Sequence, residues 1–221
     1  MTLQDKIALV TGASRGIGKA TVSLLRENGA TVIGCSRGSD TDFCCDVSSS
    51  KDVHALFEHI KTHYGQLDIL VNNAAMIKPG PITSQPLSEW DDHYQTNVRG
   101  LVHCCQHAFQ LMAPNGGCIV NVSSLAGFQG AEKFPGFSAY VASKSAVTGL
   151  TEALAVEGKP LGIRVNAIAP GAVNTQMLKG IAPDLKTTTE PEDIAQLILG
   201  LVHPLQSKSL NGTILPVYSN E

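Results

Sequence analysis

The feature that most restricts the fold of this chain is a regular alternation of short apolar segments with longer amphipathic ones. Lys6–Thr11 is almost continuously apolar, as is typical of a strand buried on both faces of a parallel sheet. Gly16–Asn28 follows with apolar residues at helical spacing, and Gly29 is suited to end that helix. This order of strand, tight turn and helix is the first unit of a parallel α/β sheet.

The same alternation continues along the chain. We expect further strands at 31–36, 43–47, 67–71, 118–122, 163–169 and 213–217, and helices at 52–64, 88–112, 138–157 and about 190–202. The segment Thr189-Glu190-Pro191-Glu192 has the pattern of a capping box that opens the last helix. No linker, repeat or low-complexity tract divides the 221 residues. The sequence therefore predicts a single doubly wound α/β domain with a Rossmann fold over residues 1–221.

One connection departs from this pattern. Only the six residues from Arg37 to Asp42 separate the second predicted strand from the third, whereas a parallel crossover normally takes a dozen or more and includes a helix. Six residues at about 3.3 Å each span roughly 20 Å, just enough to return along a short strand. We therefore expect that this helix is missing and that the adjoining flank of the sheet is thinly covered.

Composition excludes several classes of function. The 16 Lys and Arg residues against 19 Asp and Glu give a net charge of −3, so no basic surplus is available to bind a nucleic-acid backbone. No apolar run reaches the roughly 18–20 residues of a membrane span, and the first residues lack a signal-peptide pattern. The six cysteines include two adjacent pairs and no C-x-x-C, which is a poor framework for disulfides or zinc. We expect free thiols, a cytoplasmic location, and no nucleic-acid or membrane partner.

A glycine-rich segment, Thr11-Gly12-Ala13-Ser14-Arg15-Gly16-Ile17-Gly18, connects the first strand to the first helix. Glycines at these positions permit a tight turn and let backbone amides and the helix N-terminus approach a pyrophosphate. The pattern alone is weak, and an ordinary turn is the alternative interpretation. Its place between a strand and a helix favours a dinucleotide site.

The residues after the second strand bear on which dinucleotide is bound. A carboxylate there suits the ribose 2′-hydroxyl of NAD, whereas an arginine suits the 2′-phosphate of NADP. Here Arg37 follows the strand, and Arg15 lies in the glycine-rich segment. Two guanidinium groups fit a dianionic phosphate, so we expect NADP(H) to be favoured over NAD(H). Asp40 and Asp42 complicate this assignment, and Arg37 is alternatively a solvated turn residue.

Tyr140 and Lys144 lie four residues apart in a predicted helix, which places them one above the other on one face. An ammonium group beside the phenol would lower the tyrosine pKa from about 10 and make it a usable general acid and base near neutral pH. A Y-x-x-x-K pattern by itself is common and mostly structural.

Taken together, the motifs resemble the short-chain dehydrogenase/reductase family. The matching segments follow the family order over about residues 5 to 176: T-G-A-S-R-G-I-G at 11–18, Asp46-Val47, N-N-A-A at 72–75, Asn97, Ser123-Ser124, Tyr140 with Lys144, and Pro170-Gly171 with Thr175. The first eighteen residues are most similar to 3-oxoacyl-carrier-protein reductases. The resemblance implies an NAD(P)-dependent oxidoreductase that interconverts a small-molecule carbonyl and an alcohol and assembles as a homodimer or homotetramer.

The resemblance also implies a role for individual residues. Tyr140 would donate a proton to the substrate carbonyl, Ser124 would hydrogen-bond its oxygen, and Lys144 would hold the nicotinamide ribose. Asn97 would kink its helix and anchor a water that connects Lys144 to solvent, and Asn73 would border the ribose. The expected catalytic set is Asn97, Ser124, Tyr140 and Lys144. The expected cofactor-binding set, which includes Arg37 from the charge argument, is Gly12, Ser14, Arg15, Gly16, Ile17, Gly18, Arg37, Asp46, Val47, Asn73, Ala74, Tyr140, Lys144, Pro170, Gly171, Val173 and Thr175.

Other features leave the substrate open. Segment 129–137 is longer than in the acyl-carrier reductases, and its residues Phe134 and Phe137 either line the substrate entrance or merely pin a loop. The segment from Met177 to Thr189 is short for a substrate lid, which weakens the acyl-carrier reductase interpretation. A carrier protein would also need a basic patch, for which the nearby candidates are Arg99, Lys133, Lys179 and Lys186.

The last predictions concern a possible metal site at two histidines and the alternative functions of the chain. His103 and His107 have spacing that could bind a metal, but a third ligand is lacking, so we expect no metal. The family resemblance implies instead that this helix surface faces a partner subunit. The alternatives to a carbonyl reductase are a 3-oxoacyl-carrier-protein reductase and a non-catalytic nucleotide-binding redox sensor or scaffold.

Overall fold

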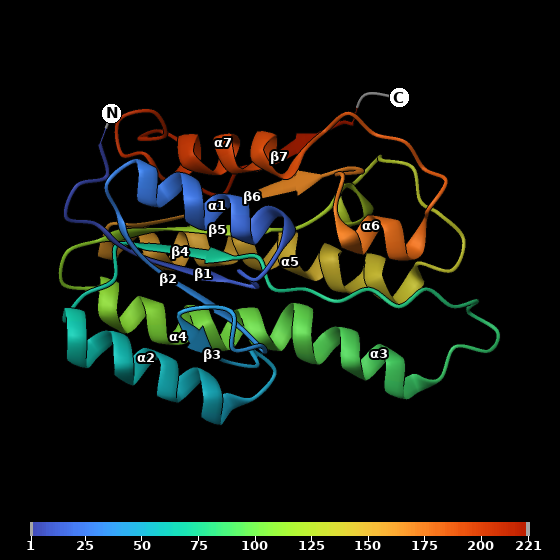
Figure 1. The fold of residues 1–221 in the computed structure, drawn as a ribbon, viewed down its shortest axis with the longest axis horizontal. Coiled ribbons are helices and arrows are strands. Elements are labelled where there is room, and N and C mark those ends of the chain that lie inside the picture. Colours follow the sequence, from blue (N-terminus) through green and yellow to red (C-terminus); the bar gives the residue numbers. More distant parts are fainter. Residues whose placement is uncertain (1, 220–221) are drawn as a thin grey trace.

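The computed structural model describes residues 2–219, which form one seven-stranded sheet with helices on both faces (Figure 1). The strand order is β3-β2-β1-β4-β5-β6-β7, and every neighbouring pair is parallel. The strands are β1 (Ile7–Thr11), β2 (Thr31–Ser36), β3 (Phe43–Cys44), β4 (Ile69–Asn72), β5 (Gly117–Val122), β6 (Ile163–Pro170) and β7 (Ile214–Val217). The predicted doubly wound parallel sheet is confirmed.

Helices alternate with the strands and bury two hydrophobic cores. They are α1 (Gly16–Glu27), α2 (Ser50–Tyr64), α3 (Leu87–Tyr94), α4 (Gly100–Met112), α5 (Ser138–Gly158), α6 (Gln176–Ile181) and α7 (Pro191–Val202), with short turns η1 (Gln95–Arg99), η2 (Leu125–Gly127) and η3 (Lys159–Leu161). α1 and α7 cover one face of the sheet, and α2, α4 and α5 cover the other. Leu9 faces one core and Val10 the other, because successive side chains of β1 point to opposite faces. Both are fully buried, as the apolar run predicted.

The direction of the strand order reverses between β1 and β4. From β1 the chain passes to β2 on one side, whereas β4, β5 and β6 extend the sheet on the other. In such sheets the carboxyl ends of the strands form a crevice at the reversal point, where ligands bind. The segments that follow β4 and β5, together with α6, gather at the right-hand end of Figure 1, beyond these strand ends.

The connection between β2 and β3 contains no helix, as its length predicted. The Asp42 carboxylate ties this connection to the sheet, because it accepts hydrogen bonds from the Gly34 amide and from Arg26 Nη2, both at 2.7 Å. β3 is shorter than the predicted 43–47. Asp46 begins a turn, in which its Oδ1 accepts from the Ser48 amide at 2.9 Å, and the chain then enters α2.

Three other boundaries differ from expectation. The predicted helix 88–112 is divided by η1, a turn of π-helix. The short helix α6 was not predicted, because its six residues are too few to show a periodic pattern. The capping box of α7 joins Glu190 to Asp193, one residue later than the sequence pattern suggested. Among the residues that the structure describes, none of the helices combines the length and apolar content needed to cross a bilayer.

Candidate active site

The glycine-rich segment forms a close-packed turn between β1 and α1. Gly12 and Gly16 have φ angles of +66° and +53°, a region that favours glycine. A Cβ on Gly18 would lie 2.3 Å from the Gly12 carbonyl oxygen, and one on Gly12 would lie 2.8 Å from Cα of Ala74. These close approaches explain why side chains are excluded from the turn.

The N-terminus of α1 is open toward the crevice. Its N-cap residue, Arg15, makes no capping side-chain hydrogen bond, and the first turn contains no acidic residue. The first amides of a helix have no intrahelical acceptor and carry a partial positive charge, so they suit an anion. This end of α1, with the glycine turn before it, fits a pyrophosphate.

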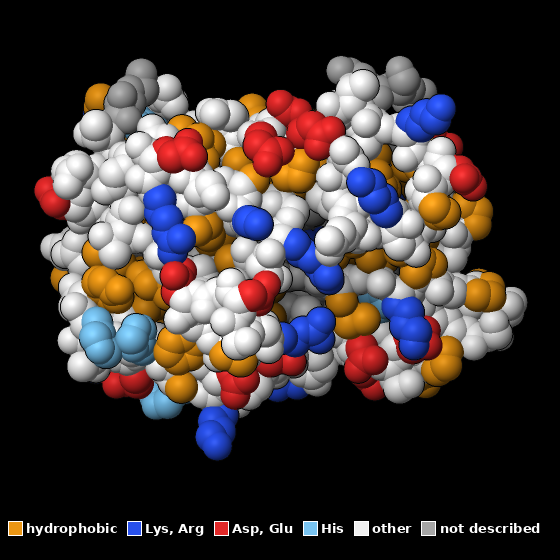
Figure 2. All heavy atoms as spheres, viewed as in Figure 1, with side chains coloured by type: hydrophobic (Ala, Val, Ile, Leu, Met, Phe, Trp, Pro, Cys, Tyr) orange, Lys and Arg blue, Asp and Glu red, His pale blue; other side chains and the backbone are white. Residues whose placement is uncertain are grey.

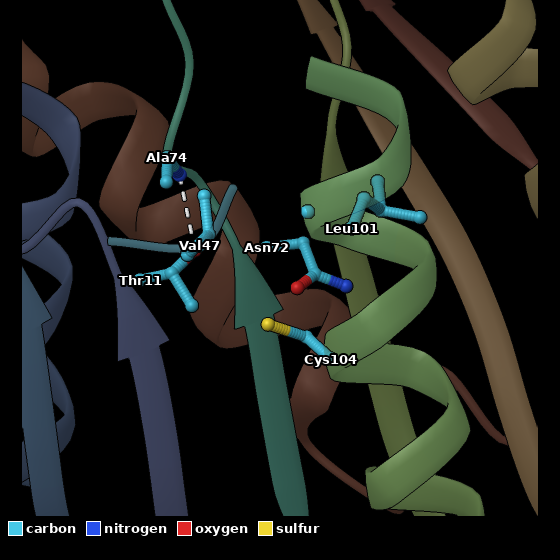
Figure 3. A pocket seen from close by; sticks show the side chains of 7 residues that line it. Thr11, Val47, Asn72, Ala74, Leu101 and Cys104 are labelled. Carbon is cyan, nitrogen blue, oxygen red and sulfur yellow. Dashed lines mark hydrogen bonds between the residues drawn. The ribbon is translucent and has the colours of Figure 1, made fainter. Parts of the chain in front are cut away.

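Asn73 holds the glycine turn against the end of β4. Its Nδ2 donates to the carbonyl oxygens of Thr11 and Gly12 at 2.9 and 3.0 Å. Thr11 Oγ1 in turn accepts from the amides of Asn73 and Ala74, and the second of these bonds is drawn beside a small cavity in Figure 3. The side-chain amide of Asn73 therefore fixes the shape of the turn, in addition to any contact with a ribose.

The two arginines expected to bind a phosphate are both exposed. Arg15 Nη1 donates to Gln176 Oε1 at 3.3 Å, which links the glycine turn to α6. Within residues 2–219, Arg37 forms no ion pair, whereas Asp42 is paired with Arg26 at 2.7 Å. Asp42, one of the two carboxylates that complicated the coenzyme assignment, is therefore neutralised by Arg26.

The loop after β6 closes the crevice from the opposite side. The Gly171 amide donates to the Val217 carbonyl oxygen at 2.8 Å, and Val173 is buried. Thr175 caps α6 by accepting from the Leu178 amide at 3.2 Å. A Cβ on Gly16 would lie 3.2 Å from Cγ2 of Thr175, so the predicted loop meets the glycine turn directly.

The structure brings Ser124, Tyr140 and Lys144 together where β5 ends and α5 begins. The Ser124 hydroxyl lies near enough to the Tyr140 phenol to act on its pKa, and Ser124 Oγ accepts from the Ala126 amide at 3.1 Å. Ser123, by contrast, is buried and donates to the Lys144 carbonyl oxygen at 3.0 Å. Of the two serines, Ser124 is therefore the one near the phenol.

The predicted effect of Lys144 on Tyr140 is wrong for this structure. Lys144 Nζ donates to the Val122 carbonyl oxygen at 2.7 Å and lies 5.9 Å from the centroid of the Tyr140 ring. Burial raises the pKa of Tyr140 to about 12, although the nearby Ser124 hydroxyl opposes this rise. Burial also lowers the pKa of Lys144 to about 8. Desolvation disfavours both charged forms and outweighs the attraction that the spacing suggested.

Asn97 lies in the π-helical turn and joins two parts of the site. Its Oδ1 accepts from the Met76 amide at 2.8 Å, and its Nδ2 donates to the Met76 carbonyl oxygen and to Ser143 Oγ, both at 3.0 Å. Ser143 Oγ donates in turn to the Tyr140 carbonyl oxygen at 2.8 Å. Asn97 therefore fixes the segment after β4 relative to α5, in agreement with the predicted distortion of its helix.

His93, which lies one turn before Asn97, was not singled out by sequence reasoning. The imidazole is fully buried; its Nε2 accepts from the Lys78 amide at 3.1 Å, and Nδ1 lies 2.6 Å from the Glu89 carbonyl oxygen. Together, His93 and Asn97 hold the backbone of segment 76–78. Their spacing of four residues on one helix face was the available signal.

His107 is half-buried against α2 of the same chain. Its ring stacks on Phe57 of α2 with centroids 5.2 Å apart, and the His54 ring lies at 5.8 Å. Burial and the neighbouring imidazoles lower the pKa of His107. The adjacent Cys104 and Cys105 are buried, as expected for this helix.

The chain is similar to known proteins over most of its length. The short chain dehydrogenase family matches residues 6–186. A 3beta-hydroxysteroid dehydrogenase of Mediterraneibacter gnavus is 41% identical over 202 residues, which cover 83% of this chain and 71% of the relative.

Two solved structures share the fold over almost the whole chain. A short chain dehydrogenase from Burkholderia cenocepacia, in complex with NADP, has a TM-score of 0.90 and 30% identity and covers 99% of this chain and 98% of its own. A 3-ketoacyl-(acyl-carrier-protein) reductase from Brucella melitensis, complexed with NADH, has a TM-score of 0.90 and 29% identity and covers 98% of each chain. With the glycine turn and the Ser124–Tyr140–Lys144 group at the strand ends, these matches show that the chain is an NAD(P)-dependent oxidoreductase of the short chain dehydrogenase family.

Proposed function

We propose that this chain, as one domain over residues 1–221, interconverts a small-molecule ketone or aldehyde and the corresponding alcohol with NADP(H). The observation that carries this proposal is the grouping of the Ser124 hydroxyl, the Tyr140 phenol and the buried Lys144, whose Nζ lies 5.9 Å from the centroid of the Tyr140 ring. These groups lie at the carboxyl ends of the strands, as does the glycine turn. The bound nicotinamide would supply or accept the hydride.

The residues of the chain provide the position and the proton. Ser124 and Tyr140 present two hydroxyl groups to the carbonyl oxygen, and the phenol transfers a proton to that oxygen during reduction. A pKa of about 12 keeps the Tyr140 phenol protonated near neutral pH, which is the form that reduction requires. Lys144 would bind the ribose of the coenzyme, and Asn97 acts through segment 76–78 and Ser143 as a positioning residue.

The preference for NADP(H) rests on charge. Arg15 and Arg37 are exposed beside the glycine turn and the end of β2, while the Asp42 carboxylate is engaged by Arg26 and the Gly34 amide. A 2′-phosphate at this position would find two guanidinium groups and only Asp40 as a nearby competing carboxylate. The known relatives bind either coenzyme, since one solved structure contains NADP and another NADH.

The proposal is tested by Tyr140→Phe, with Tyr64→Phe on α2 as the matched control. Removal of the phenol hydroxyl should lower kcat by about 10²–10⁴-fold, because the proton donor is lost. The NADPH dissociation constant should stay within about twofold, since the aromatic ring remains. Steady-state kinetics and calorimetry would measure the two quantities. Normal turnover by Tyr140→Phe would disprove the proposed chemistry.

A 3-oxoacyl-carrier-protein reductase is the second candidate, and the Brucella melitensis structure favours it. The basic patch for a carrier protein is smaller than the sequence suggested. Lys133 Nζ is occupied, because it donates to the carbonyl oxygens of Leu125 and Phe128 at 3.0 and 2.7 Å. NADPH-dependent reduction of an acetoacetyl thioester at a rate above that of simple ketones would favour this candidate. The Mediterraneibacter gnavus relative adds a 3β-hydroxysteroid as a further substrate to test.

The remaining proposals concern the setting of the enzyme. All six cysteines are free thiols, which supports a cytoplasmic location. We expect a homodimer or homotetramer, and size-exclusion chromatography with light scattering would decide between them. Tight NADPH binding without turnover of any ketone, quinone or aldehyde would favour a sensor or scaffold instead.

A further inference from the structure

A row of three aromatic rings leads from Tyr140 to the molecular surface. The centroids of Tyr140 and Phe137 lie 6.4 Å apart with an interplanar angle of 84°. The centroids of Phe137 and Phe134 lie 6.2 Å apart at 62°. Both pairs have the edge-to-face arrangement that aromatic rings prefer. Phe134, at the outer end of the row, is 56% exposed to solvent.

Polar contacts hold the segment that carries this row. Lys133 Nζ bonds to two carbonyl oxygens of η2 and its flank, as described above, and the Gly136 carbonyl oxygen accepts from the Gly80 amide at 2.9 Å. The loop therefore has anchors that do not involve the Phe134 ring. A ring that is mostly in water contributes little to the stability of a loop, because only buried apolar area does so. These contacts weigh against the interpretation that Phe134 merely pins the loop.

Exposed apolar side chains occur on the segment of Phe134 and on the neighbouring segment that follows Gly80. The ammonium group of Lys133 is directed to backbone carbonyls. Ile82, two residues after Gly80, is 66% exposed. Figure 2 shows hydrophobic side chains interspersed with charged ones at this end of the molecule, at the right of the view. Exposed apolar surface beside a polar site is typical of a ligand-binding surface.

We infer that the substrate is a bulky apolar ketone or alcohol, and that Phe134 and Phe137 bind its body while the carbonyl lies at Tyr140. This inference rests on the proposed function. Rigid rings on the substrate would pack against the faces and edges of the two phenyl rings and cover Phe134. An acidic carrier protein would find no matching charge on this row.

The test compares two ketones with NADPH in the wild type, Phe134→Ala, Phe134→Trp and Leu205→Ala. The bulky substrate is a fused-ring 3-ketosteroid, and the small one is cyclohexanone. Leu205 is a suitable control because it is 81% exposed and follows α7, at the opposite end of the molecule in Figure 1. Unchanged melting temperatures would confirm that all variants are folded.

In Phe134→Ala, the ratio of kcat/KM for the bulky ketone to that for the small one should fall roughly tenfold, mainly through KM. Phe134→Trp should restore the ratio, and Leu205→Ala should leave it unchanged. If the wild type reduces both ketones and the ratio is the same in Phe134→Ala, the inference is overturned and the proposed function stands. If the wild type prefers cyclohexanone or an acetoacetyl thioester, the inference is also overturned. Reduction of no ketone by the wild type would overturn the proposed function as well.

Discussion

Helices α1 and α7 are the same length and pack beside each other on one face of the sheet, but their N-termini differ (Figure 1). At α7, Asp193 Oδ2 accepts from the Glu190 amide at 2.8 Å, and the Asp193 amide donates to the Glu190 carbonyl oxygen at 3.1 Å. At α1, the N-cap is Arg15, with neither a capping side chain nor an acidic residue in the first turn.

The difference separates an end that stabilises the fold from an end that binds a ligand. A capping side chain contributes typically about 1 kcal/mol to stability, and α1 lacks this contribution. Its amides have no side-chain cap and its N-cap carries a positive charge, which suits the phosphates of a coenzyme. Lower stability of this kind is expected where backbone amides must remain available to bind a ligand.

The largest effect is expected when α1 is given the kind of cap that α7 has. In Arg15→Asp, a carboxylate would replace a guanidinium beside the phosphates, so NADPH should bind roughly 100-fold more weakly. The same carboxylate should raise the free energy of unfolding of the free protein by about 0.5–1 kcal/mol, through capping and the helix dipole. Calorimetry and denaturant titration would measure both. Lys19→Asp, four residues further along α1, serves as the control, and unimpaired NADPH binding by Arg15→Asp would refute the comparison.

A smaller effect on coenzyme affinity is expected for a substitution of Arg37, which tests the proposed contact with the 2′-phosphate. Arg37→Ala should weaken NADPH binding about 10–100-fold, because one charge-assisted contact is removed. NADH lacks the 2′-phosphate, so its dissociation constant should change by no more than about twofold. An equal loss for the two coenzymes would show that Arg37 does not select NADP(H).

At the capped helix the expected effect is on stability alone. Asp193→Ala should lower the free energy of unfolding by about 1 kcal/mol, since the Glu190 amide loses its acceptor. Glu192→Ala, a change of the same charge in the same turn, is the matched control. NADPH affinity should be unaffected in both variants. Weaker coenzyme binding by Asp193→Ala would mean that the two helix ends are not independent.

The smallest expected effect is on the pH dependence of stability, and it arises at the N-terminus of α2. There the side chain of the N-cap residue Ser49 accepts a hydrogen bond from the Asp52 amide. Hydrogen bonds from the Asp46 amide and from Ser49 lower the pKa of Asp52 below its usual value. A lowered carboxyl pKa stabilises the fold above the unfolded value of about 3.9, and the benefit is lost as pH falls through the folded value. The stability difference between wild type and Asp52→Asn should therefore narrow between pH 5 and pH 2. A difference that is constant with pH would contradict the assigned hydrogen bonds.

Much of the fold could be predicted because local patterns determine it. The apolar run before Gly12 and the helical spacing after Gly16 define β1 and α1 whatever their neighbours are. The missing helix between β2 and β3 followed from chain length alone. β3 was predicted too long, because the turn at Asp46 depends on its contact with Ser48.

The proximity of Tyr140 and Lys144 could be predicted from the sequence, but the direction of their pKa shifts could not. Spacing on α5 placed Tyr140 and Lys144 near each other, but it could not show that Lys144 bonds to the Val122 carbonyl. Desolvation depends on how completely the tertiary structure covers a group, and that is not encoded in a four-residue interval. His93 escaped notice for a similar reason, since its partner at Lys78 belongs to a different segment.

The π-helical turn η1 determines how the helix would respond to the deletion of a residue. An extra residue in one helical turn rotates the side chains that precede the turn about the helix axis, relative to the side chains that follow it. In this chain Asn97 lies on the wide turn and bonds to Met76, while Cys104 and Cys105 of α4 remain in the core. A deletion of one residue within η1 would leave the apolar stripe of α4 intact and turn His93 out of phase with Lys78. The rotational phases of α3 and α4 are therefore set separately, on either side of η1.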